Sequence, residues 1–228
     1  MNQIIRIGMD TSKYFFQLHG VDGSERPVLR RKLRRNEVLA FFAKQPSTVI
    51  GMEACGAGHY WARELRKLGH EVKLIAPQHV KAYVKRNKND GRDAEGLCEA
   101  MSRPTMQFVS VKTEEQQAAL MLAGVRQQLI TRRTQLSNAI RGYAAEFGLI
   151  AAKGLVKVEP LLAQIAQDES LPALAREMFT LQGRDYARLQ VELKAVEARL
   201  WPGIVPMLIA GVWQRFRGSG RSAPRRWS

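Results

Sequence analysis

The sequence predicts an α/β protein with two parts: a mixed sheet with helices over residues 1–105, followed by an all-helical coiled-coil region over residues 106–200. In the first part, three strand-like runs joined by short turns precede an alternation of helix and strand, which is typical of a mixed sheet. In the second part, apolar residues recur every three or four positions, which is typical of long helices. A chain of 228 residues is long enough for both parts.

The first three expected strands are residues 4–8, 14–21 and 27–33, with the turn residues Asp22 and Gly23 between the second and the third. The first run is short and apolar, as buried strands are.

Helices and strands then alternate. Asn36 is expected to cap a helix over residues 38–42, because an Asn side chain can accept from the first free backbone N–H groups. A buried strand is expected over residues 47–52 and a fifth strand over residues 71–75. Between them Gly56 and Gly58 open a helix that Gly69 ends, and its apolar face carries Trp61, Leu65 and Leu68.

Two long helices are expected after Pro104, joined by shorter ones between Pro160 and Leu181. Arg132 interrupts the apolar seam of the first, which is Ala118, Leu122, Val125, Leu129, Leu136, Tyr143 and Phe147. The seam of the second is Tyr186, Leu189, Leu193, Val196 and Leu200. Such seams fit an antiparallel coiled coil or a dimer arm, and an ordinary helical bundle fits them equally well.

The composition indicates a partner with many negative charges. The chain carries 36 Lys and Arg against 21 Asp and Glu, a net charge of +15, which favours nucleic acid over a membrane. The N-terminal residues do not read as a secretion signal, and the apolar stretch 203–212 is about half of the ~20 residues that a membrane span needs. The only cysteines, Cys55 and Cys98, indicate a reduced, cytoplasmic protein without a disulfide framework.

Four carboxylates lie where strands end or a helix begins: Asp10, Glu53, Asp90 and Asp93. Side chains at the carboxyl ends of parallel strands point into the crevice where α/β sheets place ligands. Four oxygen ligands suit Mg²⁺, which can assist phosphoryl displacement. Singly, Asp10 could be a turn residue and Asp93 a helix cap, whereas Glu53 at the end of an apolar strand is harder to explain structurally.

Two basic clusters could hold a phosphate backbone. The first precedes the first helix and contains Arg30, Arg31, Lys32, Arg34 and Arg35. The second surrounds Asp90 and contains Lys81, Lys85, Arg86, Lys88 and Arg92. The alternative for both is a solvated charged face. The four histidines show no zinc-ligand spacing and are read as structural or surface residues.

Three segments carry a resemblance to a known family: IGMDTSK (residues 7–13), IGMEACGAGHYWARELRKLGHEVKLIAP (50–77) and VKRNKNDGRDAEGL (84–97). They resemble the DEDD-type transposases of bacterial insertion sequences, the insertion-sequence 110 family, and the similarity extends from residue 3 to about residue 200. The resemblance implies an RNase H-like (RuvC-like) catalytic domain and a coiled-coil arm, with a C-terminal domain that carries a catalytic serine. The four acids of the family then fall on Asp10, Glu53, Asp90 and Asp93. Members act as oligomers on element-end and target DNA, guided by an element-encoded RNA.

Residues 201–228 depart from the family. They contain five Arg and no acid, and Ser219, Ser222 and Ser228 lack the context of the family's serine, so no catalytic serine is assigned in this chain. One permitted back-translation, read one base earlier, contains the IPGIGP turn that the family has at this point. We therefore expect this tail to be out of frame and the chain to be a truncated transposase, which is incomplete for strand exchange because the serine domain is missing.

Three other functions remain open. A Holliday-junction-resolvase-like nuclease would share the four acids but would not need the helical arm. A nucleic-acid-binding remnant without catalysis would share the basic surface. An actin-like sugar kinase would share IGMDTSK but needs a second Gly-rich phosphate turn, which the sequence lacks.

Overall fold

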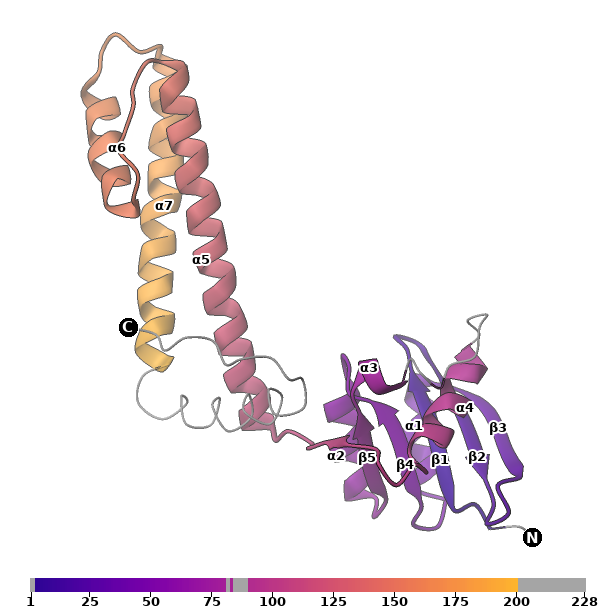
Figure 1. The fold of residues 1–228 in the computed structure, drawn as a ribbon. Helices are drawn as coiled ribbons and strands as arrows, with labels where there is room; N and C mark the ends of the chain where they lie inside the picture. The colour runs from indigo at the N-terminus through magenta and orange to yellow at the C-terminus, as the bar shows by residue number, and fades with distance from the viewer. Residues whose placement is uncertain (1–2, 81–82, 84–89, 201–228) are drawn as a thin grey trace. The chain divides into compact units, whose positions relative to one another are not determined.

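The computed structural model describes residues 3–80, 83 and 90–200, without the side chains of residues 90 and 91. The chain divides into two compact units, Met1–Thr113 and Glu114–Ser228, and each is described by itself (Figure 1). The tail from residue 201 lies outside the described residues, so its out-of-frame reading stays a prediction.

The first unit is built on a six-stranded sheet with the strand order β3-β2-β1-β4-β5-β6. β1, β2 and β3 are antiparallel neighbours, β4 and β5 run parallel to β1, and β6 is antiparallel to β5. The predicted mixed α/β sheet is therefore confirmed, and this arrangement fits an RNase H-like fold. The strands are β1 (Arg6–Thr11), β2 (Phe15–Val21), β3 (Pro27–Arg34), β4 (Val49–Glu53), β5 (Glu71–Ile75) and β6 (Phe108–Val109).

Among the described residues of this unit, four α-helices and one 3₁₀ helix accompany the sheet: η1 (Arg35–Glu37), α1 (Val38–Phe42), α2 (Gly58–Lys67), α3 (Pro77–Val80) and α4 (Asp90–Ala100). The prediction that Asn36 caps α1 is wrong, because Asn36 lies inside η1. The backbone N–H of Arg34 instead donates to the Glu37 carboxylate at 2.7 Å. Leu68 was predicted on the apolar face of α2 but follows the helix and is exposed, whereas Gly69 ends the turn with a φ of 87°, as glycine can.

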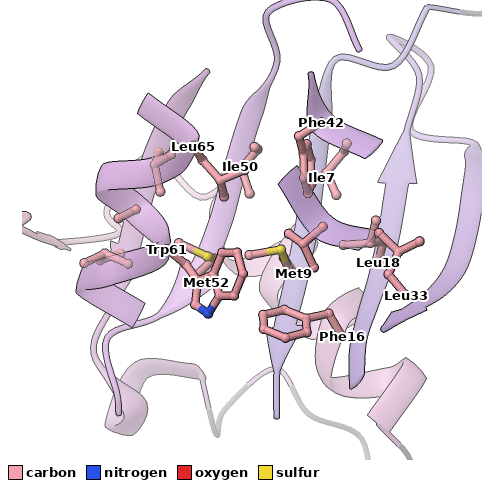
Figure 2. Packing of buried hydrophobic residues seen from close by; sticks show 14 residues of the cluster. Ile7, Met9, Phe16, Leu18, Leu33, Phe42, Ile50, Met52, Trp61 and Leu65 are labelled. Carbon is pink, nitrogen blue, oxygen red and sulfur yellow. The ribbon is translucent and has the colours of Figure 1, made fainter. Parts of the chain in front are cut away.

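One face of the sheet buries the main core against α1 and α2. Alternate strand residues point to this face, as the pleat requires, and meet Phe42, Trp61 and Leu65 from the helices. Figure 2 shows this packing, in which the Phe16 and Trp61 rings make an edge-to-face contact at 4.9 Å. The strand residues of this core are Ile7, Met9, Phe16, Leu18, Leu33, Ile50, Met52, Val72 and Leu74.

α4 packs on the opposite face of the sheet, where it contacts two glycines. Gly8 of β1 and Gly51 of β4 are register partners in the parallel pair. A Cβ at Gly8 would clash with the Ala94 carbonyl oxygen and come within 2.6 Å of the Cys98 nitrogen, and a Cβ at Gly51 would clash with Met101. The missing side chains therefore let the α4 backbone lie directly on the sheet.

Up to residue 200, where its description ends, the second unit contains α5 (Glu114–Glu146), η2 (Leu155–Lys157), α6 (Val158–Gln167) and α7 (Ala173–Leu200). α5 and α7 are antiparallel, because Arg126 pairs with Glu197 while Ile140 lies in the same buried cluster as Phe179. The predicted seam of α7 lies at this interface, with Tyr186, Leu189 and Leu193 buried.

The predicted seam of α5 is only partly correct. Leu129 and Leu136 contact α7 clusters as expected. Four other members are exposed: Ala118, Val125, Tyr143 and Phe147. The residues buried on α5 are instead Ala119, Leu129, Ser137, Ile140 and Ala144.

Candidate active site

Asp10 and Glu53 are brought together by the register of two parallel strands. Gly8 pairs with Gly51 and Met9 with Met52, so the next position on each strand places Asp10 beside Glu53. Both lie two residues beyond the glycines that contact α4 and therefore on the same face of the sheet. Neighbouring strands are about 4.8 Å apart, so the two carboxylates belong to one small region. The strand ends predicted from the sequence thus converge at this point.

The charges of both carboxylates affect the pKa of the Cys55 thiol. Partial burial raises the pKa of Cys55 above its ordinary value, and the nearby charges of Glu53 and Asp10 raise it further. A single side chain can respond to both charges because β4 ends at Glu53 and the chain turns there toward α2. The Glu53 carbonyl oxygen is packed against Gly58, where a Cβ would approach it to 2.5 Å.

The start of α4 supplies the other two predicted acids. α4 begins at Asp90, so Asp90 and Asp93 both belong to the first turns of the helix, where the sequence predicts them. The helix runs opposite to β1: the Cys98 carbonyl accepts from Arg6 Nε at 3.2 Å, while Ala94 lies over Gly8. Residues that precede Ala94 therefore lie toward the Asp10 end of β1. The Asp93 side chain is half-buried.

The described residues do not by themselves form a metal cluster. No group of three or more His, Cys, Asp or Glu side chains that could hold a metal ion occurs among the described ones. The side chain of Asp90 lies outside that description.

A row of polar residues continues from the carboxylates to the edge of the sheet. Asp10 pairs with Gln17 of β2, and Gln17 pairs with Lys32 of β3. Alternation along β3 puts Arg30 and Arg34 on this same face, beside Lys32. All three are exposed on an edge strand, which gives the acidic region a basic border.

The remaining residues of the first basic cluster point to the other face. The guanidinium group of Arg31 lies 5.2 Å from the centre of the Phe41 ring, and that of Arg35 lies 5.0 Å from the Trp61 ring. The first cluster is therefore divided between two faces, and only part of it borders the carboxylates.

Arg92 is the one described member of the second basic cluster. It is exposed on α4 and lines a pocket of about 320 Å³ with Tyr83, Glu95, Gly96 and Glu99. Lys81, Lys85, Arg86 and Lys88 lie outside the described residues, so their role stays a prediction.

His19 is a buried member of the carboxylate face that the sequence did not single out. It pairs with Gly8, next to α4. Burial lowers the pKa of His19, Glu95 opposes that shift and Arg30 reinforces it. His59 and His70 are buried and hydrogen-bonded to Lys112 and Thr48, respectively, in agreement with a structural role.

The sequence analysis did not identify the contact of Gly8 and Gly51 with α4 or the position of Cys55 near the carboxylates. The signal for the first was present, because Gly8 and Gly51 each precede a predicted acid by two residues. That shared spacing predicts that both acids and both glycines lie on one face once the strands are paired.

The helices show no membrane-spanning character. Within the described ranges, every helix is too short or too polar to cross a bilayer.

The known proteins that this chain is similar to are transposases. A family model for the DEDD transposases of insertion sequence IS110, described as "Transposase", matches residues 7–147. The chain is 60% identical over 200 residues to the putative transposase y4pF/y4sB of Sinorhizobium fredii, a match that covers 88% of this chain and 52% of that protein.

More distant relatives carry similar names. Over 200 residues the chain is 36% identical to the transposase for insertion sequence element IS1328 of Yersinia enterocolitica, covering 88% of this chain and 60% of the relative. Over 205 residues it is 38% identical to the transposase for insertion sequence element IS1111A of Coxiella burnetii, covering 86% and 56%. The chain thus spans between half and three fifths of the length of these relatives.

Proposed function

The chain belongs to the DEDD transposase family of insertion sequence IS110, and from that membership we propose that it acts on DNA as the carboxylate-bearing part of a transposase or site-specific recombinase. The observation that carries the proposal is the parallel register of β1 and β4, in which Asp10 and Glu53 each follow the Met9–Met52 pair by one position. The basic edge strand β3 lies two strands from β1 in the same sheet. The unit up to Thr113 would be the RuvC-like catalytic domain.

The donor chemistry at these strand ends fits a divalent metal. Asp10 and Glu53 offer hard oxygen ligands of the kind that Mg²⁺ prefers, and their joint effect on Cys55 supports their closeness. Asp90 and Asp93, at the start of α4, would complete the four-carboxylate set. Bound Mg²⁺ would stabilise the negative charge that develops on a phosphodiester during displacement.

The basic border would hold the substrate's backbone. Arg30, Lys32 and Arg34 lie on the carboxylate face, so phosphates bound there would lead a DNA strand toward Asp10. Arg92 and the other members of the second basic cluster would act from the side of α4. A guide RNA, proposed from family membership, would use the same kind of contacts.

The helical unit would serve as an oligomerisation arm. The antiparallel α5 and α7 share an apolar seam and the Arg126–Glu197 ion pair, which supports a coiled-coil arm. An oligomer formed through this arm would bring two or more of the carboxylate-bearing units to the DNA ends. The protein would act in the cytoplasm.

A second candidate function is nucleic-acid binding without catalysis. It is favoured by the lack of a cluster of three metal-binding side chains in the described part of the chain. The same basic surface would serve it, but the carboxylates would then have no chemical task.

Metal binding and metal-dependent DNA cleavage test both candidates. With Asp10 as a ligand, Mg²⁺ should raise the melting temperature of the wild-type chain but not that of Asp10→Asn, because a bound ion stabilises only the folded state. The Asp185→Asn variant, which loses an exposed carboxylate of α7, is the matched control.

DNA that carries the element ends should be nicked in Mg²⁺ by the wild type and by Asp185→Asn only. Salt-sensitive DNA binding without a melting shift or nicking would support the second candidate instead. A chain that binds neither DNA nor RNA would exclude both.

A further inference from the structure

Two exposed aromatic side chains lie at the turn between β1 and β2, next to the candidate site. Tyr14 is 64% exposed and Phe15 is 42% exposed, whereas the next residue, Phe16, is fully buried in the core. Of these three consecutive aromatic residues, Phe16 alone is buried in the core. The other two are large apolar surfaces that folding leaves in solvent.

Phe15 lies on the carboxylate face. Phe16 points into the core beneath α1 and α2, so its neighbour in the strand points the opposite way. Phe15 also pairs with Arg34, and it lies two residues along β2 from Gln17, the partner of Asp10. Two strand residues cover about 7 Å, roughly the distance between successive nucleotides in a nucleic-acid strand.

The backbone of this turn is held in place. The Ser12 hydroxyl donates to the Phe15 carbonyl at 2.5 Å, and the Phe15 N–H donates back to the Ser12 oxygen at 3.1 Å. The Arg35 N–H donates to the Tyr14 carbonyl at 2.9 Å, which links the turn to the start of η1. Both rings are thus carried on a fixed support, which limits the entropy lost when a partner binds.

Each ring has a cation beside it. Lys32 Nζ lies 4.4 Å from the centre of the Phe15 ring, and Lys13 Nζ lies 5.2 Å from that of Tyr14. Proteins that bind single-stranded nucleic acid alternate cations for phosphates with rings on which bases stack. A flexible Lys side chain can move from a ring to a phosphate while a base takes its place. A duplex cannot use the rings in this way, because its bases already stack on one another.

We propose that Phe15 and Tyr14 form a stacking platform for unpaired nucleotides of the DNA strand that passes over Asp10 and Glu53. Lys13, Lys32 and Arg34 would contact the phosphates of the same strand. The inference rests on the proposed function for the identity of that strand. It adds to that function a substrate class: DNA that is single-stranded beside the carboxylates.

The test measures the affinity of the full chain for fluorescein-labelled oligonucleotides of one sequence as single-stranded DNA, duplex DNA and single-stranded RNA. All titrations contain EDTA, so that cleavage plays no part. Phe15→Leu should weaken single-stranded DNA binding about tenfold and leave duplex binding within twofold. Phe15→Tyr retains the ring and should bind as the wild type does. Tyr60→Leu, which removes a 42% exposed ring from α2 on the other face of the sheet, is the control and should change neither affinity.

The salt dependence separates stacking from charge. Phe15→Leu should leave the slope of log K against log salt unchanged, whereas Lys32→Gln should lower it by about one phosphate contact for both forms of DNA. Equal losses on single-stranded and duplex DNA, no loss in Phe15→Leu, or a loss confined to RNA would each overturn the platform.

These outcomes are independent of the catalytic proposal. If affinity for single-stranded DNA depends on Phe15 but the chain never nicks DNA, the stacking platform is supported and the proposed catalytic function is contradicted. If Mg²⁺-dependent nicking is lost in Asp10→Asn while Phe15→Leu binds DNA normally, the catalytic function is supported and the stacking platform is contradicted.

Discussion

The thiol of Cys55 connects a single residue to the charge state of the candidate carboxylates. Its pKa is raised by partial burial and by the charges of Glu53 and Asp10. Thiolate, not thiol, reacts with alkylating reagents, so Cys55 should react slowly at neutral pH although reagents in solution can reach the part of the residue that is exposed. Cys98 is buried and should not compete in the folded protein.

Glu53→Gln should therefore speed alkylation of Cys55 by iodoacetamide at pH 8. Removing the negative charge lowers the pKa of the thiol, so more thiolate is present at that pH, and each unit of change raises the rate up to about tenfold. Mass spectrometry of the modified chain gives the rate at Cys55 over a range of pH. Glu71→Gln, an exposed acid at the start of β5, is the control. An unchanged rate in Glu53→Gln would show that Glu53 does not lie beside the thiol.

At the scale of elements, the contact between α4 and the sheet depends on Gly8. A methyl group at this position would press on the backbone of α4 at Ala94 and Cys98, and backbone cannot rotate away as a side chain can. Gly8→Ala should lower the free energy of unfolding by about 1–3 kcal/mol, as overpacking does.

Urea unfolding followed by circular dichroism measures this loss. Gly23→Ala is the matched control, because nothing lies within 4 Å of a Cβ there, and it should change stability by less than about 0.5 kcal/mol. Equal stability of the two variants would mean that α4 does not rest on Gly8.

Four of the five longer strands could be predicted from the sequence because each contains an apolar run, whereas β3, which is half Arg and Lys, could be predicted from its place after the turn at Asp22 and Gly23. The predicted strand starts fall within two residues of the observed ones, and β5 matches in full. β6 could not be predicted, because a strand of two residues has no period to detect. The closeness of Asp10 and Glu53 could not be predicted from the local sequence pattern alone, because it depends on the parallel register of β1 and β4.

The seam of α5 shows where periodicity fails. A repeat of seven residues drifts by about 20° per heptad on a straight helix, so over four heptads it leaves the buried face. Leu129, near the middle, is buried as predicted, whereas Tyr143 and Phe147 at the end are exposed. Both line an apolar pocket with Leu174 and Met178 instead.

At the scale of the whole molecule, the net charge of +15 predicts how affinity depends on salt. Each phosphate contact releases counterions, so six such contacts would cost about a thousandfold in affinity between 50 and 200 mM salt. Titration of duplex DNA by fluorescence anisotropy at several salt concentrations gives the slope. An affinity independent of salt would remove the basic surface as the binding site.

The cations of β3 have a further consequence for the free protein. β3 is one of the two outermost strands of the sheet, and an outermost strand can pair with the same edge of another copy. Two such edges would bring Arg30, Lys32 and Arg34 of each copy against one another, and their mutual repulsion opposes that pairing. The charges that suit β3 to a polyanion therefore also protect the sheet from growing into an intermolecular aggregate.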